Sequence, residues 1–474
     1  MMTTMIKENG ITFKELEKNI FKNICRLGQD YTREFLEQYD QILMKERDRA
    51  RYRHKGYRKT SVKTVYGEVE YRRAVYEETD EDGIRHFVFL LDEALGLDHV
   101  GLISENMAEI MVKAVTELSY RQSAEKITEM TGQPISAMGV WNVIQELGEK
   151  VCENEKELVE EYRAGHLHGK SEAAVLFEEA DGIYISMQGE DRKRSSQGEI
   201  KVGIAYDGWR REGPGRYRLN RPVVAAGFER SKEFQEYREA VIADTFNLDE
   251  TETRILNGDG GSWIRKVKDR STVFQLDPFH RNKAVRELIH HKKAQRDLME
   301  LLEEKNIDGV FHYLTVYHDS LSDEKEIADT EALIRYYSNN RSGLLPYQDQ
   351  IQDLPEAPDG LEYRNMGTME NHVWSIIARR MKHNHTSWSR RGGNHLAKIL
   401  AKKCSGRLQE VTEKLQRPAF EEEQEEVLYE KIQTAAKTPC KDGHGYGYPV
   451  EGHLASLDTA VRGDGRRMFS IVGF

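Results

Sequence analysis

Apolar positions at helical spacing open the chain and predict a helical N-terminal region over residues 1–58. Two groups of these positions predict two helices between residues 12 and 50: Phe13, Leu16, Ile20, Ile24 and Leu27, then Phe35, Leu36, Ile42 and Leu43. From residue 60 the pattern changes to β-branched and aromatic residues with a turn at Gly67. This change of period predicts a small β-meander over residues 59–100.

Residues 101–155 return to helical periodicity in three segments. The second segment begins at Ser119, Gly132 and Pro134 interrupt the chain, and Ser136 is a suitable N-cap for the third. The third segment has one apolar face, formed by Val140, Ile144 and Leu147. This spacing fits a helix-turn-helix, whose second helix enters the major groove of DNA, and fits a plain three-helix bundle equally well.

Strand and helix patterns alternate from residue 173 onward. Three successive strand candidates, followed by helix, strand, helix, strand and helix, predict an α/β fold with a ribonuclease H-like mixed sheet, whose first part spans residues 170–294. Residues 295–358 are mostly helical with acidic faces and are interpreted as an insertion. Residues 359–410 resume the core with a basic helix, and residues 411–474 form an acidic helix and a Gly-rich tail.

Composition limits the class of protein. The 474 residues are 38% hydrophobic and 9% aromatic, which excludes wholesale disorder. No apolar stretch approaches the roughly 18 residues of a membrane-spanning helix, so we expect a soluble, cytoplasmic protein. The four cysteines lie far apart, without a Cys-x-x-Cys pair, which argues against a cysteine-based zinc module: Cys25, Cys152, Cys404 and Cys440.

Two local basic segments stand out against a net charge of -11. The first runs from Lys45 to Lys63, with nine Lys or Arg against two acids, and a solvated basic linker is its plain alternative. The second spans residues 371–409, which contain no Asp or Glu. The candidate DNA-binding residues within them are Arg51, Arg53, Lys55, Arg58, Lys59, Arg379, Arg380, Lys382, Arg390 and Arg391.

Three carboxylates could carry chemistry. Asp181 lies within an apolar strand candidate, where a carboxylate must be paired, at a strand end or bound to metal. Asp259 ends a later strand and is followed by Gly260 and Gly261, and strand ends are where α/β sheets place ligands. Glu370 stands near the start of the basic helix. Each acid alone is explained as a cap or turn residue, but together they suit two Mg²⁺ or Mn²⁺ ions that act on a phosphodiester.

Four segments resemble a known family: EADGIYI, LNGDGGSWI, QLDPFHRNKA and GTMENHVWSIIARRMKHNHTSWSRRGG. Together they resemble the ISLre-type bacterial insertion-sequence transposases, which are allied to the Mutator-like DDE transposases. The resemblance extends to about residue 410. It implies that Asp181, Asp259 and Glu370 form a catalytic, metal-binding triad, with the helical insertion placed before the Glu.

The resemblance also implies a supporting role for Asp277 and His280. Related Mutator-like enzymes carry a Cys-x-x-His at this place, shortly after the second Asp of the triad. The Asp in the first position argues against zinc binding, so we expect this pair to position the second Asp or the DNA.

From the resemblance we expect a DDE transposase. It would bind the ends of an insertion sequence, hydrolyse one strand at each end and join the freed 3′-ends to target DNA. Its partner would be double-stranded DNA, its assembly a homodimer or larger, and its location the cytoplasm at the nucleoid, with neither a membrane nor a nucleotide cofactor. The alternatives are a ribonuclease H-like nuclease without joining activity and an inactive DNA-binding element remnant.

Overall fold

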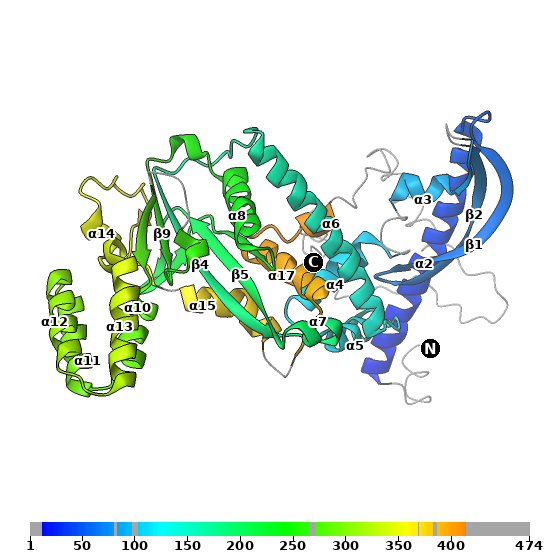
Figure 1. The fold of residues 1–474 in the computed structure, drawn as a ribbon. Helices are drawn as coiled ribbons and strands as arrows, with labels where there is room; N and C mark the ends of the chain where they lie inside the picture. Colours follow the sequence, from blue (N-terminus) through cyan, green and yellow to red (C-terminus); the bar gives the residue numbers. More distant parts are fainter. Residues whose placement is uncertain are drawn as a thin grey trace, which may run out of the picture.

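A computed structural model describes residues 12–79, 83–96, 103–265, 272–367, 369–382 and 386–413. The region expected over residues 411–474 therefore lies outside the described residues from 414 onward. Figure 1 shows a mixed α/β body with a long β-hairpin at one end and a group of helices at the other. None of the described helices is both long and apolar enough to cross a membrane.

The N-terminal region is a single helix, α2 (Phe13–Glu46), so the prediction of two helices is wrong. Thr12 closes its first turn with a capping box. The helix continues through Gly28 because the Tyr66 ring packs 3.2 Å from the position that a Cβ at Gly28 would take. Gln29 also donates a hydrogen bond to the Tyr66 carbonyl oxygen at 2.9 Å. These contacts offset the cost of about 1 kcal/mol that a glycine carries inside a helix.

An antiparallel meander in the order β1-β2-β3 packs beside α2. Its elements are β1 (Arg53–Thr64), β2 (Gly67–Thr79) and β3 (Arg85–Val88), followed by the short helix α3 (Leu90–Leu95). The hairpin turns at Gly67, which has a φ of 140°. Because β1 begins at Arg53 and not at residue 59, part of the first basic segment lies within the strand itself.

Three helices follow, at the places that the sequence predicts. They are α4 (Glu105–Val115), α5 (Tyr120–Thr131) and α6 (Ala137–Arg163). Ser119 and Ser136 are the N-caps of α5 and α6, and their side chains accept hydrogen bonds from the backbone of the first turn. The apolar face of α6 belongs to one continuous hydrophobic cluster with the central sheet and the C-terminal helices.

The central sheet has five strands in the order β10-β9-β4-β5-β8. Its strands and their connecting helices are β4 (Val175–Ser186), α7 (Gly189–Arg194), β5 (Gln197–Tyr206), β8 (Val223–Gly227), α8 (Ser231–Thr245), the 3₁₀ turn η1 (Leu248–Glu250), β9 (Thr253–Gly258), α9 (Ser262–Arg265), β10 (Thr272–Leu276) and α10 (Pro278–Leu288). Strands β10, β9 and β4 are parallel to one another. Strand β5 pairs antiparallel with both of its neighbours, β4 and β8. The protein therefore has the mixed α/β sheet that the sequence predicts.

A hairpin that the sequence analysis missed projects from this sheet. Strands β6 (Trp209–Gly213) and β7 (Arg216–Leu219) pair with β11 (Leu361–Glu362) in a second small sheet. The Gly-Pro-Gly at residues 213–215 was a turn signal, and Tyr217 and Leu219 alternate with arginines in β7, but β6 has only one apolar residue, Trp209.

The predicted insertion is helical and has a hydrophobic core of its own. It comprises α11 (Lys292–Glu303), α12 (Ile307–Asp319), α13 (Glu324–Asn339), the 3₁₀ turn η2 (Arg341–Leu344) and α14 (Tyr347–Gln350). Its apolar faces meet Leu276 of β10 and Val285 of α10. The insertion therefore extends the β10 edge of the sheet, as Figure 1 shows.

The last part of the core is a nearly continuous helix followed by a second one. It comprises α15 (Met369–Val373), a π-helical turn η3 (Trp374–Ala378), α16 (Arg379–Met381), α17 (Arg390–Cys404) and the single turn α18 (Glu410–Glu413). Helix α17 packs against α6 and β8, and α15 packs against β4.

Both faces of the central sheet are buried. On one face Phe177 and Ile183 of β4 join the cluster that includes α6 and α17. On the other face Leu176 of β4 joins the cluster that includes Phe234 of α8. Because side chains alternate along a strand, Asp181 shares its face with Phe177 and Ile183, which is the face that α15 also covers.

Candidate active site

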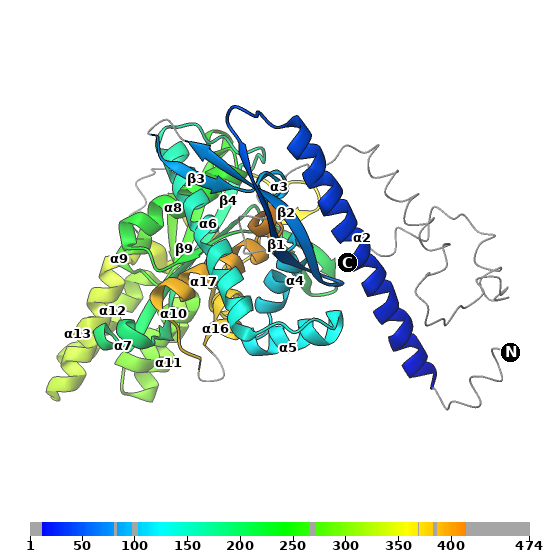
Figure 2. The same cartoon turned by 90° about the vertical axis from the view of Figure 1, so that its right-hand side faces the viewer.

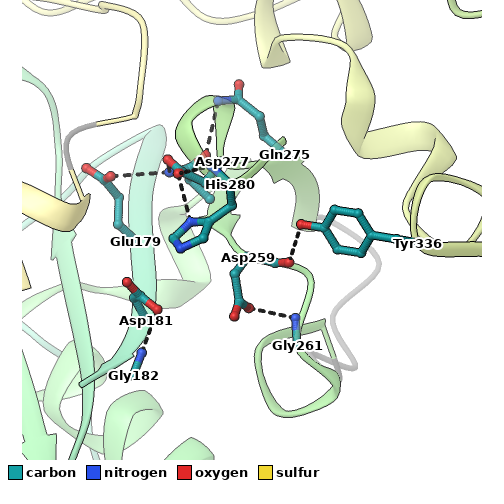
Figure 3. A network of polar contacts seen from close by, with 10 residues as sticks. Glu179, Asp181, Gly182, Asp259, Gly261, Gln275, Asp277, His280 and Tyr336 are labelled. Carbon is teal, nitrogen blue, oxygen red and sulfur yellow. Dashed lines mark hydrogen bonds and ion pairs between the residues drawn. The ribbon is translucent and has the colours of Figure 1, made fainter. Parts of the chain in front are cut away.

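The register of three parallel strands brings three carboxylates together. The pairing of β4, β9 and β10 places Ala180, Gly258 and Leu276 in one row. Asp181, Asp259 and Asp277 are each the next residue along the chain. They therefore lie side by side where the parallel pairing ends, and Figure 3 shows the side chains of Asp181 and Asp259 beside the His280 ring.

Asp181 is partly buried among these charges. Its Oδ1 accepts a hydrogen bond from the Gly182 amide at 2.7 Å. Burial raises the pKa of Asp181 to about 6, although the Gly182 amide and the His280 ring lower it, and the nearby carboxylates of Asp259 and Asp277 add smaller upward contributions. Because burial destabilises the charged form of this carboxylate, a bound cation would stabilise it.

Asp259 is held by the loop that follows β9. Its Oδ1 accepts the Gly261 amide hydrogen at 2.7 Å, and Figure 3 shows this contact at the edge of the site. Its backbone carbonyl accepts a hydrogen bond from the Tyr336 hydroxyl at 2.7 Å. Tyr336 belongs to α13, so the helical insertion fixes the backbone of this candidate ligand.

Asp277 is the N-cap of α10 and forms a pair with His280. Its Oδ2 accepts from the His280 amide at 3.2 Å and contacts His280 Nδ1 at 3.0 Å, while its Oδ1 accepts from Asn257 Nδ2 at 3.1 Å. Burial would raise the pKa of Asp277, but the hydrogen bonds from His280 and Asn257 lower it. The hydrogen bond to Asp277 in turn raises the pKa of His280. The two side chains are therefore held together at the rim of the site, and the carboxylate of Asp277 favours the protonated form of His280.

The free oxygens separate candidate ligands from supporting residues. Within the described part of the chain, Oδ2 of Asp181 and Oδ2 of Asp259 accept no hydrogen bond, whereas both oxygens of Asp277 do. Hard divalent cations prefer carboxylate oxygens. Asp181 and Asp259 thus fit a Mg²⁺ or Mn²⁺ ion, and Asp277 fits the supporting role that the resemblance implies. Among the described side chains, no group of three or more His, Cys, Asp or Glu is arranged as a complete metal site.

A buried polar network lies behind these carboxylates and was missed by the sequence analysis. Glu179 is fully buried, and its oxygens accept from the Tyr206 hydroxyl at 2.7 Å and from Asn257 Nδ2 at 3.3 Å. Gln275 donates to Asn257 Oδ1 at 3.2 Å, so the network connects β4, β5, β9 and β10. The signal was available, because Glu179 is separated from Asp181 by one residue and so points to the same face.

Glu370 lies in the first turn of α15, but its side chain is outside the described residues. The backbone places this turn near the site, because His372 of the same helix has its Nδ1 3.6 Å from Glu179 Oε1. Burial lowers the pKa of His372 to about 4, so at neutral pH this ring is uncharged and the contact is not an ion pair. The third member of the predicted triad therefore starts a helix that packs against β4 beside Asp181.

The basic helix differs from the prediction at Arg380. The sequence analysis treated Arg379 and Arg380 as one exposed phosphate-binding pair. Arg379 is exposed and forms an ion pair with Glu117, but Arg380 is only 9% exposed. Its Nε donates to the Val115 carbonyl oxygen at 2.6 Å, and its guanidinium lies 5.4 Å from the Trp388 ring centroid. The expectation that Arg380 is exposed is therefore wrong, because its side chain joins α16 to α4.

The other three predicted DNA-binding cations of the acid-free segment are exposed. Lys382 follows α16, and Arg390 and Arg391 begin α17. Arg390 donates through Nη2 to the Phe228 carbonyl oxygen at 2.6 Å, and Arg391 forms an ion pair with Glu149 at 2.8 Å. Of these three predicted DNA-binding residues, only Lys382 has no ion pair or hydrogen bond to its side chain within the described residues.

The predicted cations of the N-terminal segment lie on or beside β1. Arg51 pairs with Glu78, and Lys55 pairs with Glu77 at 3.0 Å. Arg53, Arg58 and Lys59 are exposed on the strand. They lie at the end of the molecule that is remote from α13, as Figures 1 and 2 show.

Comparisons with known proteins agree with one another. A family model described as an uncharacterised protein family, UPF0236, matches residues 6–417. A protein from Streptococcus gallolyticus named "UPF0236 protein in vanSb 3'region" is 23% identical over 418 residues, which are 85% of this chain and 87% of that protein. The match includes the central sheet, the insertion and the basic helix.

These comparisons correct the family expectation. The sequence resemblance indicated the ISLre-type insertion-sequence transposases, but the family description states that UPF0236 is uncharacterised, and neither description names a transposase. The four segments behind that resemblance all lie inside the matched region.

Proposed function

The chain belongs to the uncharacterised protein family UPF0236, and for this member we propose metal-dependent cleavage and joining of DNA strands, the reaction of a DDE transposase. One observation carries the proposal. Asp181 and Asp259 are placed by strand register on neighbouring parallel strands, each with one carboxylate oxygen free of described hydrogen-bond partners. In enzymes that act on phosphodiesters, paired carboxylates commonly bind the divalent ions.

The strand order supports the proposal. Numbered along the chain, the five strands β4, β5, β8, β9 and β10 lie in the order 3-2-1-4-5, with the second strand antiparallel to its neighbours. This order is consistent with the ribonuclease H-like sheet that we propose, in which acids on the first and fourth strands meet. The predicted Glu370 begins the helix that covers the same face.

Each residue of the site has a task under this proposal. Asp181 and Asp259 would hold a divalent ion, with Glu370 as the third ligand, and such an ion activates a water or 3′-hydroxyl and stabilises the leaving oxygen. His280, whose pKa is raised by Asp277, offers a cation to a phosphate oxygen. Tyr336 and Gly261 keep Asp259 in place through its backbone carbonyl and its Oδ1.

The first test is a pair of isosteric variants in a nicking and joining assay. Asp181→Asn and Asp259→Asn remove a ligand charge and keep the shape, so each should lower Mg²⁺-dependent nicking of supercoiled plasmid by at least about a thousandfold. Asp249→Asn is the matched control, because Asp249 is exposed on the η1 turn. Labelled duplex ends with free 3′-hydroxyls, incubated with the same plasmid, report joining.

The outcomes separate the candidate functions. Loss of nicking and joining in both variants, with control activity at the parent level, supports the proposal. If the parent nicks DNA but gives no joined products at any metal concentration, the protein is a nuclease without joining activity. If either variant retains parental nicking in Mg²⁺, that residue is not a ligand and the proposed site is wrong.

A further inference from the structure

The meander of β1, β2 and β3 carries a group of exposed cations without ion-pair partners in the described structure. They come from all three strands and are Arg53, Arg58, Lys59, Arg72 and Arg85. Two further cations of the region, Arg51 and Lys55, are paired with Glu78 and Glu77. In a chain with a net charge of -11, this concentration of unpaired positive charge on one element indicates an anionic partner.

Strand register places some of these cations against one another. Lys59 on β1 is directly opposite Arg72 on β2, and Arg58 is directly opposite Arg73. Like charges at directly opposed positions of an antiparallel pair are destabilising. Arg73 is relieved by an ion pair with Asp92, but Lys59 and Arg72 have no such relief within the described residues. An anion bound between them would remove this repulsion.

Exposed apolar side chains lie among the same cations. Tyr57 is 49% exposed, Ile84 58% and Phe87 59%. The Arg58 guanidinium lies 5.8 Å from the Phe87 ring centroid. Cations interleaved with aromatic and aliphatic side chains are typical of surfaces that contact both the phosphates and the sugars or bases of nucleic acid.

Helix α2 completes one edge of the hairpin. One edge of β2 pairs with β1, but on the other edge β3 pairs only with residues 76–79, which leaves that edge without a strand partner before residue 76. Glu37 accepts the Arg72 amide hydrogen at 3.0 Å, and Asp40 accepts the Ala74 amide hydrogen at 2.9 Å. These carboxylates fix the twisted hairpin on the helix, so Lys59 and Arg72 stand on a preorganised support.

We infer that the β1–β2 hairpin is a duplex-DNA docking element, with Arg58, Lys59 and Arg72 contacting phosphates. A two-stranded β-ribbon fits the major groove of B-DNA, which is about 12 Å wide. The inference rests on the proposed function and gives its substrate a second point of contact. Figure 1 shows the hairpin at the opposite end of the molecule from the insertion, with the carboxylate-bearing strands between them. Docking on the hairpin would therefore hold the DNA at a second place, remote from the point at which it is cleaved.

The test measures binding apart from catalysis. The full chain is titrated with a fluorescent duplex of about three helical turns in EDTA, and the affinity is followed as the salt concentration rises. The triple variant Arg58→Gln, Lys59→Gln, Arg72→Gln should bind at least about tenfold more weakly, with a salt slope shallower by roughly three units, because each lost phosphate contact removes about one unit.

A charge-matched control isolates the hairpin. Lys292→Gln, Lys293→Gln, Arg296→Gln removes three exposed cations from α11 at the other end of the molecule and should bind like the parent. Circular dichroism melting of both triple variants shows whether each remains folded. Parental affinity and slope in a folded hairpin variant would overturn the inference, as would equal losses in the two variants.

Two further readouts keep this inference distinct from the proposed function. If the hairpin variant loses duplex binding but the parent never cleaves DNA in Mg²⁺, the docking element stands and the catalytic proposal fails. If the parent cleaves DNA and the hairpin variant binds duplex normally, the catalytic proposal stands and the docking inference fails. Hairpin-dependent binding to phosphatidylglycerol vesicles without binding to duplex would contradict the inference, since the surface would then select a membrane.

Discussion

Arg379 and Arg380 are consecutive in the chain and occupy opposite environments. Arg379 is exposed with Glu117 as its partner, whereas Arg380 is buried between Tyr120 and Trp388 and donates to the Val115 carbonyl oxygen. Burial lowers the pKa of Arg380, but an arginine remains a cation inside a protein. Two consecutive arginines in a sequence do not show which one is buried, because successive residues on a helix point about 100° apart.

This difference predicts opposite results for two neighbouring variants. Arg380→Gln should lower the free energy of unfolding by about 2 to 4 kcal/mol, because it removes a buried hydrogen bond and packed ring contacts. Arg379→Gln should change it by less than about 1 kcal/mol, as expected for an exposed ion pair. Urea denaturation of the two variants measures both quantities, and equal losses would show that Arg380 is not a buried structural residue.

At the scale of elements, a buried ion network joins β4, β9 and α8. Arg254 of β9 contacts Glu178 of β4 at 2.6 Å and Glu239 of α8 at 2.7 Å, and Arg238 contacts Glu239 at 3.1 Å. Burial would raise the pKa of Glu239, but the charges of Arg254 and Arg238 lower it to about 2. The network locks the helix to the strand that precedes Asp259.

The depressed pKa predicts a defined acid sensitivity. Because Glu239 is a stronger acid in the folded chain than in the unfolded one, its contribution is complete above about pH 4.5 and is lost as the pH falls towards 2. Glu239→Gln should be less stable at neutral pH and should show a flatter decline of melting temperature across this acid range. If the melting temperature of the variant falls with pH as steeply as that of the parent, Glu239 is not the cause of the acid sensitivity.

Elements differ in how far the sequence alone could define them. The N-caps Ser119 and Ser136, the strand periods and the positions of Asp181 and Asp259 all follow from local chemistry, and the structure has them where expected. The continuity of α2 could not be inferred, because it depends on Tyr66 packing at Gly28 from 38 residues further along the chain. The position of Glu179 two residues before Asp181 was a signal, but its partners could not be inferred, because they come from β5, β9 and α15.

At the scale of the whole molecule, the helical insertion and the central body have separate hydrophobic clusters. Leu298, Leu314 and Leu333 belong to the insertion cluster, which meets the body through Leu276 and Val285. The insertion also donates the Tyr336 hydroxyl to the Asp259 carbonyl oxygen. Its stability is therefore partly its own, while its position affects the candidate site.

This arrangement predicts local unfolding. Leu298→Ala creates a cavity in a fully buried position of α11 and should destabilise the insertion by about 2 to 5 kcal/mol. Hydrogen exchange should increase across residues 292–339, while residues 175–186 of β4 keep their protection. Uniformly faster exchange across both regions would show that the two clusters unfold as a single unit.

The common register of β4, β9 and β10 has a consequence for how this chain can vary in length. Asp181, Asp259 and Asp277 meet only because each follows the same row of paired residues. One added or deleted residue within any of these strands would turn its carboxylate to the opposite face of the sheet. Length changes should therefore be tolerated only in the connections, so a library of single-residue insertions selected for activity should contain none between residues 175 and 181 or between 253 and 259.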